Sequence, residues 1–266
     1  MLSIYQIIIT DVRLPRLEIK LLLQYILSKN AVQLITHDNY VLSNIEYNNF
    51  NQVVLRRQNG IPIAYIIGCK EFYSREFKVN EHTLVPRPET ELLVDTVLKL
   101  AQNNDYVLDM GTGSGCIAIT LKLECPSLCI DALDNYLNTL DIARQNALLL
   151  NADVEFIQSN WFSNITKKYN IIVSNPPYIA KNDQYLLALQ AEPQHALSDF
   201  NDGLDCIRQI IGVGKEYLLP NGYMVFEHGY DQGNVVRELF KQNGFINIIT
   251  KQDYAGLDRV TLSQFL

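Results

Sequence analysis

The 266-residue sequence has no segment rich in lysine and arginine, and its formal net charge is −7 with a pI near 5.1. Proteins that hold nucleic acid mainly through its phosphates need clustered basic side chains, so we expect no direct nucleic-acid partner. Long apolar runs are also absent, because stretches such as residues 20–27 are too short to span a bilayer. Residues 1–11 lack the basic region of a signal peptide. We therefore expect a cytoplasmic monomer without a membrane partner.

Support for metal binding or disulfides is equally weak. The five cysteines include no Cys-x-x-Cys pair and are odd in number, which disfavours a zinc site and a disulfide framework. Free thiols in a reducing cytosol fit this count better. We assign no metal, because no ligand spacing relates the four histidines, which are His37, His82, His195 and His228.

The pattern of apolar residues predicts helices in the first part of the chain. From Pro15 onward apolar residues recur at helical spacing, and residues 36–42 and 51–59 are predicted to form shorter helices. We expect residues 1–66 to form a small helical domain, to which the family resemblance described below assigns substrate docking. Residues 67–88 are predicted to be a β-hairpin linker, since β-formers occupy 65–68, 71–73 and 77–79 around a turn at 74–76.

Strands and helices alternate beyond residue 88, which predicts a parallel sheet covered on both faces. The last connection has no room for a helix, so the final strand should be antiparallel. The expected class is α/β, with a Rossmann-like, seven-stranded domain over residues 89–266. The predicted strands are 106–109, 128–133, 154–157, 171–174, 223–227, 246–250 and 259–266.

A glycine-rich loop follows the first of these strands and opens a helix at Cys116. Its G-x-G-x-G spacing differs from the G-x-G-x-x-G typical of dinucleotide sites, and an acid next to it would repel a pyrophosphate. A tight turn without a ligand is the simpler alternative. S-adenosylmethionine has no phosphate, so we predict that this cofactor is bound by Asp109, Gly111, Thr112, Gly113, Ser114 and Gly115.

Two further positions are candidates for cofactor contacts. Asp134 ends the second strand at the distance beyond the glycines where an acid accepts bonds from ribose hydroxyls; a helix N-cap is a compatible alternative. Asn160 and Trp161 follow the third strand, where an aromatic ring could pack near adenine and a neighbouring group could bond its edge. Trp161 as a core residue is nearly as well supported.

The most informative run is Asn175-Pro176-Pro177-Tyr178, which follows an apolar strand. The Asn175 side-chain oxygen and the Pro176 carbonyl can accept hydrogen bonds from an NH2 group and aim its nitrogen at a methyl donor. The prolines fix the backbone and so preorganise these acceptors, and Tyr178 can stack on the planar group. The simpler alternative is a Pro-Pro turn. Methyl transfer from a sulfonium needs no covalent intermediate and no strong base.

Together these residues resemble the release factor glutamine N5-methyltransferases, the PrmC/HemK family of class I S-adenosylmethionine-dependent enzymes. The resemblance is nearly full-length, and it is carried by residues 68–72 with 85–91, 111–117, 174–179 and 227–233. It implies that Gly111–Gly115, Asp134, Trp161 and Asn175 contact the cofactor, whose product is S-adenosylhomocysteine. Asn175, Pro176, Pro177 and Tyr178 would hold the glutamine of the Gly-Gly-Gln loop of release factors 1 and 2.

Departures and alternatives remain. Asn160 stands where the family commonly has Asp, but its amide oxygen can still accept from an adenine amino group. Arg87 is expected to be structural, and Pro88 to lie in the first turn of a helix. A nucleic-acid methyltransferase acting on adenine N6 or guanine N2 would hold a flipped base in the same way, but the charge disfavours it. A nicotinamide-dependent oxidoreductase or a cofactor-binding regulator is disfavoured by the glycine spacing.

Overall fold

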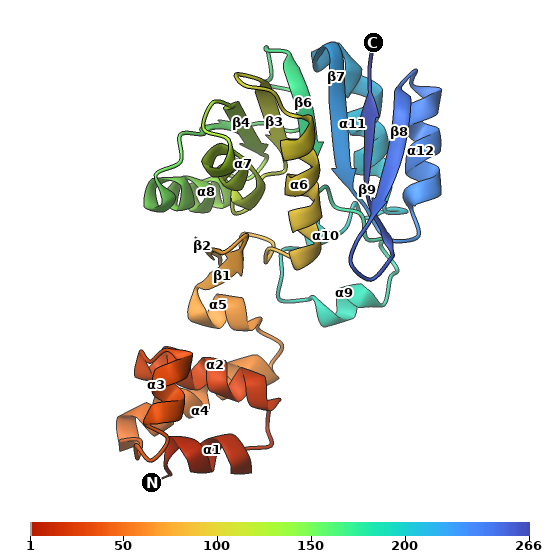
Figure 1. The fold of residues 1–266 in the computed structure, drawn as a ribbon. Coiled ribbons are helices and arrows are strands. Elements are labelled where there is room, and N and C mark those ends of the chain that lie inside the picture. Colours follow the sequence, from red (N-terminus) through yellow and green to blue (C-terminus); the bar gives the residue numbers. More distant parts are fainter. Residues whose placement is uncertain (1) are drawn as a thin grey trace. The chain divides into compact units, whose positions relative to one another are not determined.

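The computed structural model describes residues 2–266, which form two compact units that divide between Cys69 and Lys70 (Figure 1). The first unit is helical and the second is α/β. Within residues 2–266, every helix is too short or too polar to cross a membrane.

The helical unit is built from short helices that begin at capping boxes. Ser3, Asn30 and Ser43 each accept the backbone N–H three residues on, and the Gln or Glu there returns a bond to the cap. Apolar side chains including Leu22, Phe50 and Val54 form its core. The helices are α1 (Ile4–Thr10), α2 (Arg16–Leu27), α3 (Ala31–Thr36), α4 (Asn44–Gln58) and α5 (Ile63–Ile67).

Several predictions for this unit were wrong in detail. The helix predicted at 36–42 is absent from the described chain, because the Asn30 box starts α3 earlier and a turn follows Thr36. The helix predicted at 51–59 is the second half of α4, and α1 was not predicted. Residues 65–67 form the helical turn α5 instead of a strand. Pro62 precedes this turn and Gly68 ends it at a φ of 87°.

The predicted hairpin is present as β1 (Cys69–Phe72) and β2 (Arg75–Lys78). Its turn is Tyr73-Ser74 and not 74–76, since these two residues have φ of 52° and 59°. Phe72 and Phe77 are fully buried in the core of the second unit. The hairpin is therefore anchored on the α/β unit through its own side chains.

Seven strands of residues 2–266 form one sheet in the order β5-β4-β3-β6-β7-β9-β8, with β9 antiparallel to both neighbours (Figure 1). The prediction of seven strands with an antiparallel final strand is confirmed. The strands are β3 (Tyr106–Met110), β4 (Cys129–Asp134), β5 (Glu155–Gln158), β6 (Tyr169–Ser174), β7 (Leu218–Glu227), β8 (Ile246–Gln252) and β9 (Asp258–Gln264).

Both faces of the sheet are buried, as alternating side chains of one strand show. In β6, Ile171 and Val173 pack into the core made with α6 and α7, whereas Ile172 packs into the core made with α11 and α12. The helices of this unit are η1 (Pro88–Thr90), α6 (Glu91–Leu100), α7 (Cys116–Glu124), α8 (Leu137–Leu150), α9 (Tyr185–Ala188), α10 (Gln194–Leu197), α11 (Asp205–Gly214), η2 (Lys215–Tyr217) and α12 (Gly233–Gln242).

The strand order reverses between β3 and β6, which are parallel neighbours. The chain runs outward from β3 through β4 to β5 and then returns to the other side of β3. Met110 pairs with Ser174 at the ends of these two strands, and the Ser174 hydroxyl donates to the Met110 carbonyl at 2.7 Å. Ligands of open α/β sheets bind at such a switch point. The glycine loop and Asn175 therefore start side by side.

The fully buried Asn146 of α8 holds the hairpin and the glycine loop together. Its Oδ1 accepts the Lys78 N–H at 2.7 Å, and its Nδ2 donates to the carbonyls of Lys78 and Ser114. All of these partners are backbone groups, and the bond to the Ser114 carbonyl is buried, so losing the amide would leave that carbonyl unsatisfied.

We predict that Asn146→Ala lowers the free energy of unfolding by about 2–4 kcal/mol. Urea unfolding followed by circular dichroism measures this change. Leu148→Ala is the matched control, because Leu148 lies on the same helix with 80% of its surface exposed and should change stability by less than about 0.5 kcal/mol. Equal effects of the two substitutions would contradict the role given to Asn146.

Candidate active site

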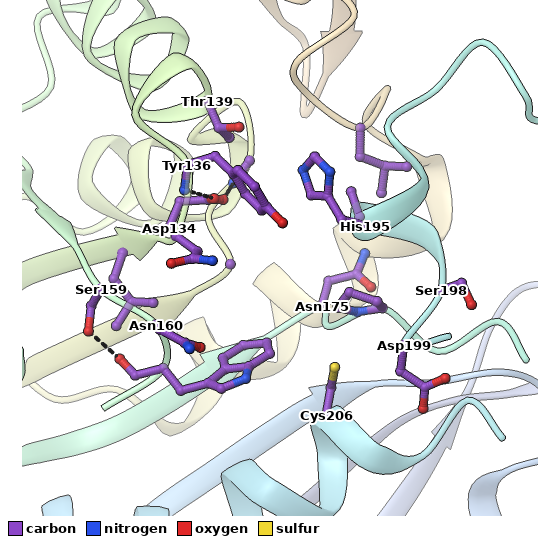
Figure 2. Close-up of a pocket in the computed structure, with 18 of the residues that line it drawn as sticks. Asp134, Tyr136, Thr139, Ser159, Asn160, Asn175, His195, Ser198, Asp199 and Cys206 are labelled. Atoms are coloured by element: carbon purple, nitrogen blue, oxygen red, sulfur yellow. Dashed lines mark hydrogen bonds between the residues drawn. The ribbon is translucent and has the colours of Figure 1, made fainter. Parts of the chain in front are cut away.

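A pocket of about 270 Å³ opens at the carboxyl ends of β3, β4, β5 and β6. Figure 2 shows Asp134, Ser159 and Asn160 along one side and Asn175, Ser198 and Cys206 along the other. The lining residues of the described chain include no Lys or Arg. The pocket is therefore suited to a ligand without phosphate groups.

Gly111 and Gly113 follow the carboxyl end of β3 and line the pocket. Their φ angles are 72° and 57°, which favour glycine. A Cβ at either position would meet no heavy atom of residues 2–266 within 4 Å, so a ligand can approach this backbone closely. Gly115 instead permits close packing of α7 on α8, because a Cβ there would lie 2.8 Å from Ile119 and 3.3 Å from Ala143.

Asp109 lies beneath the glycine loop and does not line the pocket. Its Oδ2 accepts the Thr112 hydroxyl at 2.7 Å. Burial raises the pKa of Asp109 to about 7, against the lowering effect of bonds from Thr112 and from the Ala118 N–H. Thr112 and Ser114 are likewise buried. These residues support the loop from below.

Asp134 ends β4 and lines the pocket. Its carboxylate accepts the Gly113 N–H at 3.2 Å and the Tyr136 N–H at 3.1 Å. Burial raises the pKa of Asp134, and the backbone bonds oppose that rise. The side chain thus holds the glycine loop in place and still has acceptor capacity toward the pocket.

Asn160 and Trp161 also line the pocket, after β5. The backbone of Trp161 is left-handed at a φ of 48°, and the Ser159 hydroxyl donates to its carbonyl at 2.6 Å. A large residue in this conformation costs roughly 1–3 kcal/mol and is typical of functional sites. Trp161 therefore lines the pocket and at the same time packs against the core made with α11 and α12.

Across the pocket, Tyr136 and His195 face each other, with ring centroids 3.8 Å apart (Figure 2). Burial lowers the pKa of His195, and His82 nearby lowers it further. The sequence analysis assigned no role to this pair, because a single Tyr and a single His in separate loops give no spacing signal.

Asn175 follows β6 directly and lines the pocket. Its Nδ2 donates to the Thr90 Oγ1 at 3.2 Å, so the amide oxygen is the end left for a ligand. Pro177 also lines the pocket, whereas Pro176 is buried.

Tyr178 is held at both ends. Its hydroxyl donates to the Glu227 Oε1 at 3.2 Å, and its carbonyl accepts from the Gln232 Nε2 at 2.9 Å. It does not line the pocket. The Gly203 backbone passes so close that a Cβ there would lie 2.4 Å from the Tyr178 carbonyl oxygen. Glu227 at the end of β7 and Gln232 after it therefore fix the segment that follows Asn175.

Glu227 and Thr90 were not predicted as site residues. Glu227 is only 1% exposed, and burial raises its pKa to about 7 while the Thr90 and Tyr178 hydroxyls and Arg259 lower it. Both residues lie in runs quoted for the family resemblance, but no local pattern gave them a role. Thr90 ends the short helix η1, which Pro88 opens as expected.

Arg87 pairs with Glu192 at 2.5 Å, and the other oxygen of that buried carboxylate accepts the Val85 N–H at 3.1 Å. This ion pair ties the segment before η1 to the loop between α9 and α10. Arg87 does not line the pocket, and its contacts are those of a structural residue.

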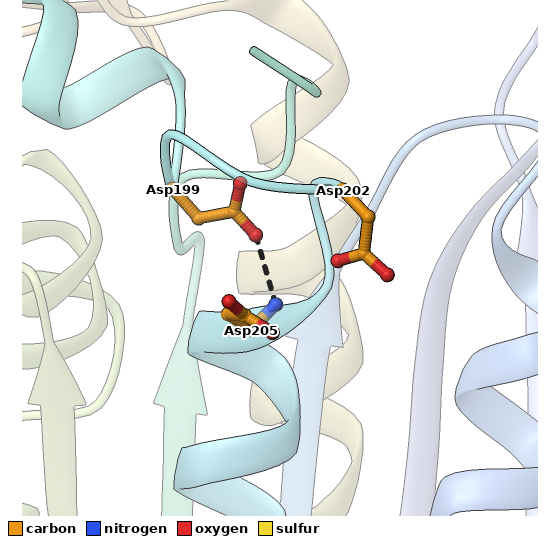
Figure 3. A group of neighbouring side chains, drawn as sticks. All are labelled: Asp199, Asp202 and Asp205. Atoms are coloured by element: carbon orange, nitrogen blue, oxygen red, sulfur yellow. Dashed lines mark hydrogen bonds between the residues drawn. The ribbon is translucent and has the colours of Figure 1, made fainter.

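Three carboxylates gather beside the pocket, with oxygens within 4.8 Å of one another: Asp199, Asp202 and Asp205 (Figure 3). Arg208 forms ion pairs with Asp202 and Asp205. Asp199 accepts the N–H groups of residues 201, 203 and 205. The cluster is thus explained as the connection that starts α11.

The sheet order, the glycine loop and a pocket at the switch point define an α/β methyltransferase. The family model "Methyltransferase small domain" matches residues 88–251, and "PrmC N-terminal domain" matches residues 10–68. A methyltransferase structure from Pyrococcus furiosus has the same fold, with a TM-score of 0.58, 18% identity, and coverage of 79% of this chain and 98% of that one.

The similarity to proteins of named function narrows the class of methyltransferase to which this chain belongs. The release factor glutamine methyltransferase of Neisseria gonorrhoeae is 43% identical over 96% of this chain and 95% of the relative. That of Aliivibrio fischeri is 42% identical over 95% of this chain and 91% of the relative. The chain belongs to the release factor glutamine methyltransferase family.

The raised pKa of Asp109 predicts a pH-dependent stability. The buried carboxyl favours the folded chain fully below its ordinary pKa of 3.8, and this contribution is lost as the pH rises through about 7. Asp109→Asn removes the ionisation. The free energy of unfolding, measured in urea, should fall for wild type relative to Asp109→Asn by about 2 kcal/mol as the pH is raised from about 5 to about 8.

The exposed Asp153 supplies the control, because Asp153→Asn should keep the same difference from wild type across this range. If the difference between Asp109→Asn and wild type did not change with pH, the burial of an ionising Asp109 would be refuted.

Proposed function

We propose that this chain transfers a methyl group from S-adenosylmethionine to the side-chain amide nitrogen, N5, of the glutamine in the Gly-Gly-Gln motif of release factors 1 and 2. Family membership supports the reaction and the class of substrate. The observation that carries the chemistry is the Asn175 amide, whose nitrogen is bound to Thr90 and whose oxygen remains for a ligand.

The pocket fits this cofactor. It has an acid at Asp134 for ribose hydroxyls, an exposed glycine backbone at residues 111 and 113, and an aromatic ring at Trp161 beside Asn160. None of the described lining residues is Lys or Arg, whose positive charge would repel a sulfonium. When bound, S-adenosylmethionine supplies an electrophilic methyl group. Asp109, Thr112, Ser114 and Gly115 support the cofactor loop from beneath.

The protein has to position a weak nucleophile. The lone pair of an amide nitrogen is delocalised into its carbonyl, so the NH2 group must be held by fixed acceptors. We propose the Asn175 Oδ1 and the Pro176 carbonyl as these acceptors, with Pro177 lining the site beside them. Tyr178, which was predicted to stack on the substrate, does not line the pocket and instead fixes this segment through Glu227 and Gln232. Pro176 and Pro177 restrict the backbone. Preorganised bonds in a closed site can contribute about 3–4 kcal/mol each in the transition state.

The remaining parts of the proposal concern the whole chain. We propose residues 1–66 as the substrate-docking domain, 67–88 as the linker and 89–266 as the catalytic domain. We expect a monomer that acts in the cytoplasm, where release factors work, and binds no nucleic acid directly. Methylation of adenine N6 or guanine N2 is the alternative outcome.

The test is to incubate the protein with release factor 1, release factor 2 and labelled S-adenosylmethionine. We expect label on the Gly-Gly-Gln glutamine, located by mass spectrometry, and none on release factors in which alanine replaces it. DNA and ribosomal RNA should remain unlabelled. Label on either nucleic acid, with none on the release factors, would sink the proposal.

Asn175→Ala should lower kcat by about 10²- to 10³-fold, because the substrate NH2 group loses its side-chain acceptor. The fold and part of the affinity for S-adenosylhomocysteine should persist, as measured by circular dichroism and titration calorimetry. Near-normal turnover of this variant would show that the acceptor mechanism is wrong.

A further inference from the structure

The backbone of Pro176 and Pro177 is only partly fixed by the proline rings. A proline ring restricts φ but leaves ψ free, and ψ of Pro176 decides where its carbonyl points. Neither proline has an N–H, so neither can hold this segment through a backbone donor of its own. The proposed function requires the Pro176 carbonyl to face the substrate nitrogen. The chain beyond Pro177 must therefore be held by another group.

The side-chain amide of Gln232 joins three segments of the chain. Its Oε1 accepts the Gly229 N–H at 2.8 Å, and its Nε2 donates to the carbonyls of Tyr178 at 2.9 Å and Gly203 at 3.2 Å. A backbone N–H can only donate and a carbonyl can only accept, so these partners define which end of the amide is the oxygen. Both hydrogens of the NH2 group are used, one on each carbonyl.

Gly203 belongs to a loop that forms one wall of the pocket, residues 197–203, which we call the wall loop. Residues 198–200 of this loop line the pocket. The wall loop also pairs with the chain after the prolines, because the Ile179 N–H donates to the Leu197 carbonyl at 2.9 Å. The wall loop and the segment that follows Asn175 are therefore held together at both ends of the loop.

The close approach at Gly203 depends on the absence of a side chain. Its φ is 85°, and a Cβ would lie 2.4 Å from the Tyr178 carbonyl oxygen and 2.9 Å from the Gln232 Nε2. Two carbonyl oxygens that face the same point repel each other unless a donor lies between them. The Gln232 NH2 group is the donor at that point.

We propose that Gln232 is a positioning residue for the methyl-acceptor site. Its NH2 group holds the Tyr178 carbonyl to the wall loop, and this contact sets the direction of the Pro176 carbonyl that receives the substrate NH2 group. Gln232 precedes helix α12 and does not line the pocket, so it acts through the backbone and touches no ligand. This inference rests on the proposed function.

The experiment compares Gln232→Glu, Gln232→Met and the control Gln242→Glu. Gln232→Glu keeps the shape but replaces the NH2 donor with an oxygen, whereas Gln232→Met keeps the length and removes every hydrogen bond. Gln242 lies exposed at the other end of α12. Methylation of release factor 1 gives kcat and KM from about pH 5.5 to about pH 8.5, each as a ratio to wild type at the same pH. Calorimetry gives the Kd for S-adenosylhomocysteine, and circular dichroism verifies the fold.

We expect Gln232→Glu to lower kcat by about 10- to 100-fold at the high end of this range, because a carboxylate would face two carbonyls and displace the acceptor segment. As the pH falls, the introduced carboxyl takes up a proton and can donate to one carbonyl again, so the kcat ratio should recover in part. Gln232→Met should show a similar loss without recovery. The Kd for S-adenosylhomocysteine should stay within about 2-fold of wild type, and Gln242→Glu should keep a ratio near one.

The ratio to wild type isolates the introduced carboxyl, because the other charged groups around this position are present in both proteins. They are Asp199, Glu227, His228, Asp231, Arg237, Asp258 and Arg259.

A kcat ratio near one for both Gln232 variants would overturn the inference. So would an equal loss in both that is the same at every pH, because the donor hydrogens would then be irrelevant. A matching loss of affinity for S-adenosylhomocysteine would also overturn it, because the role would be merely structural. If Gln232→Met fails to fold, the pH dependence of Gln232→Glu decides. The proposed function fails in a different way, namely if the wild-type protein binds S-adenosylhomocysteine and leaves release factor 1 unlabelled.

Discussion

The site depends on the pairing of two central strands. Met110 and Ser174, the last residues of β3 and β6, pair with each other, so the two strands end side by side. The Ser174 hydroxyl donates to the Met110 carbonyl and so stabilises this register. The glycine loop and Asn175 leave the sheet from these two points. A slip of one residue would turn every side chain of β6 to the other face, and it would separate the donor site from the acceptor site.

Around this pairing, a second layer of buried polar groups sets directions instead of touching ligands. Asp109 and Asn146 hold the glycine loop from below, and Glu227 and Gln232 hold the two ends of Tyr178. Each of these contacts satisfies a backbone or hydroxyl group that has little access to water. These buried hydrogen bonds therefore keep the shape of the pocket defined although the pocket is open to solvent.

The sheet and the positions of both motifs could be predicted because buried parallel strands are short apolar runs and turn residues mark their ends. Local propensity failed where flanking residues decided the outcome: Tyr65-Ile66-Ile67 has a β-forming composition, but Pro62 and Gly68 bracket a single helical turn. Thr90 could not be predicted, because its partner Asn175 is 85 residues away. Contacts that distant depend on the topology and leave no periodic signal.

The side-chain amide of Asn146 forms hydrogen bonds only with main-chain atoms, at positions 78 and 114. Such a contact makes no demand on which side chains those two positions carry, provided that the backbone keeps its path. The contact itself therefore constrains residue 146 and sets no requirement on the side chains of residues 78 and 114. A joint essential to the architecture can in this way remain invisible as a motif.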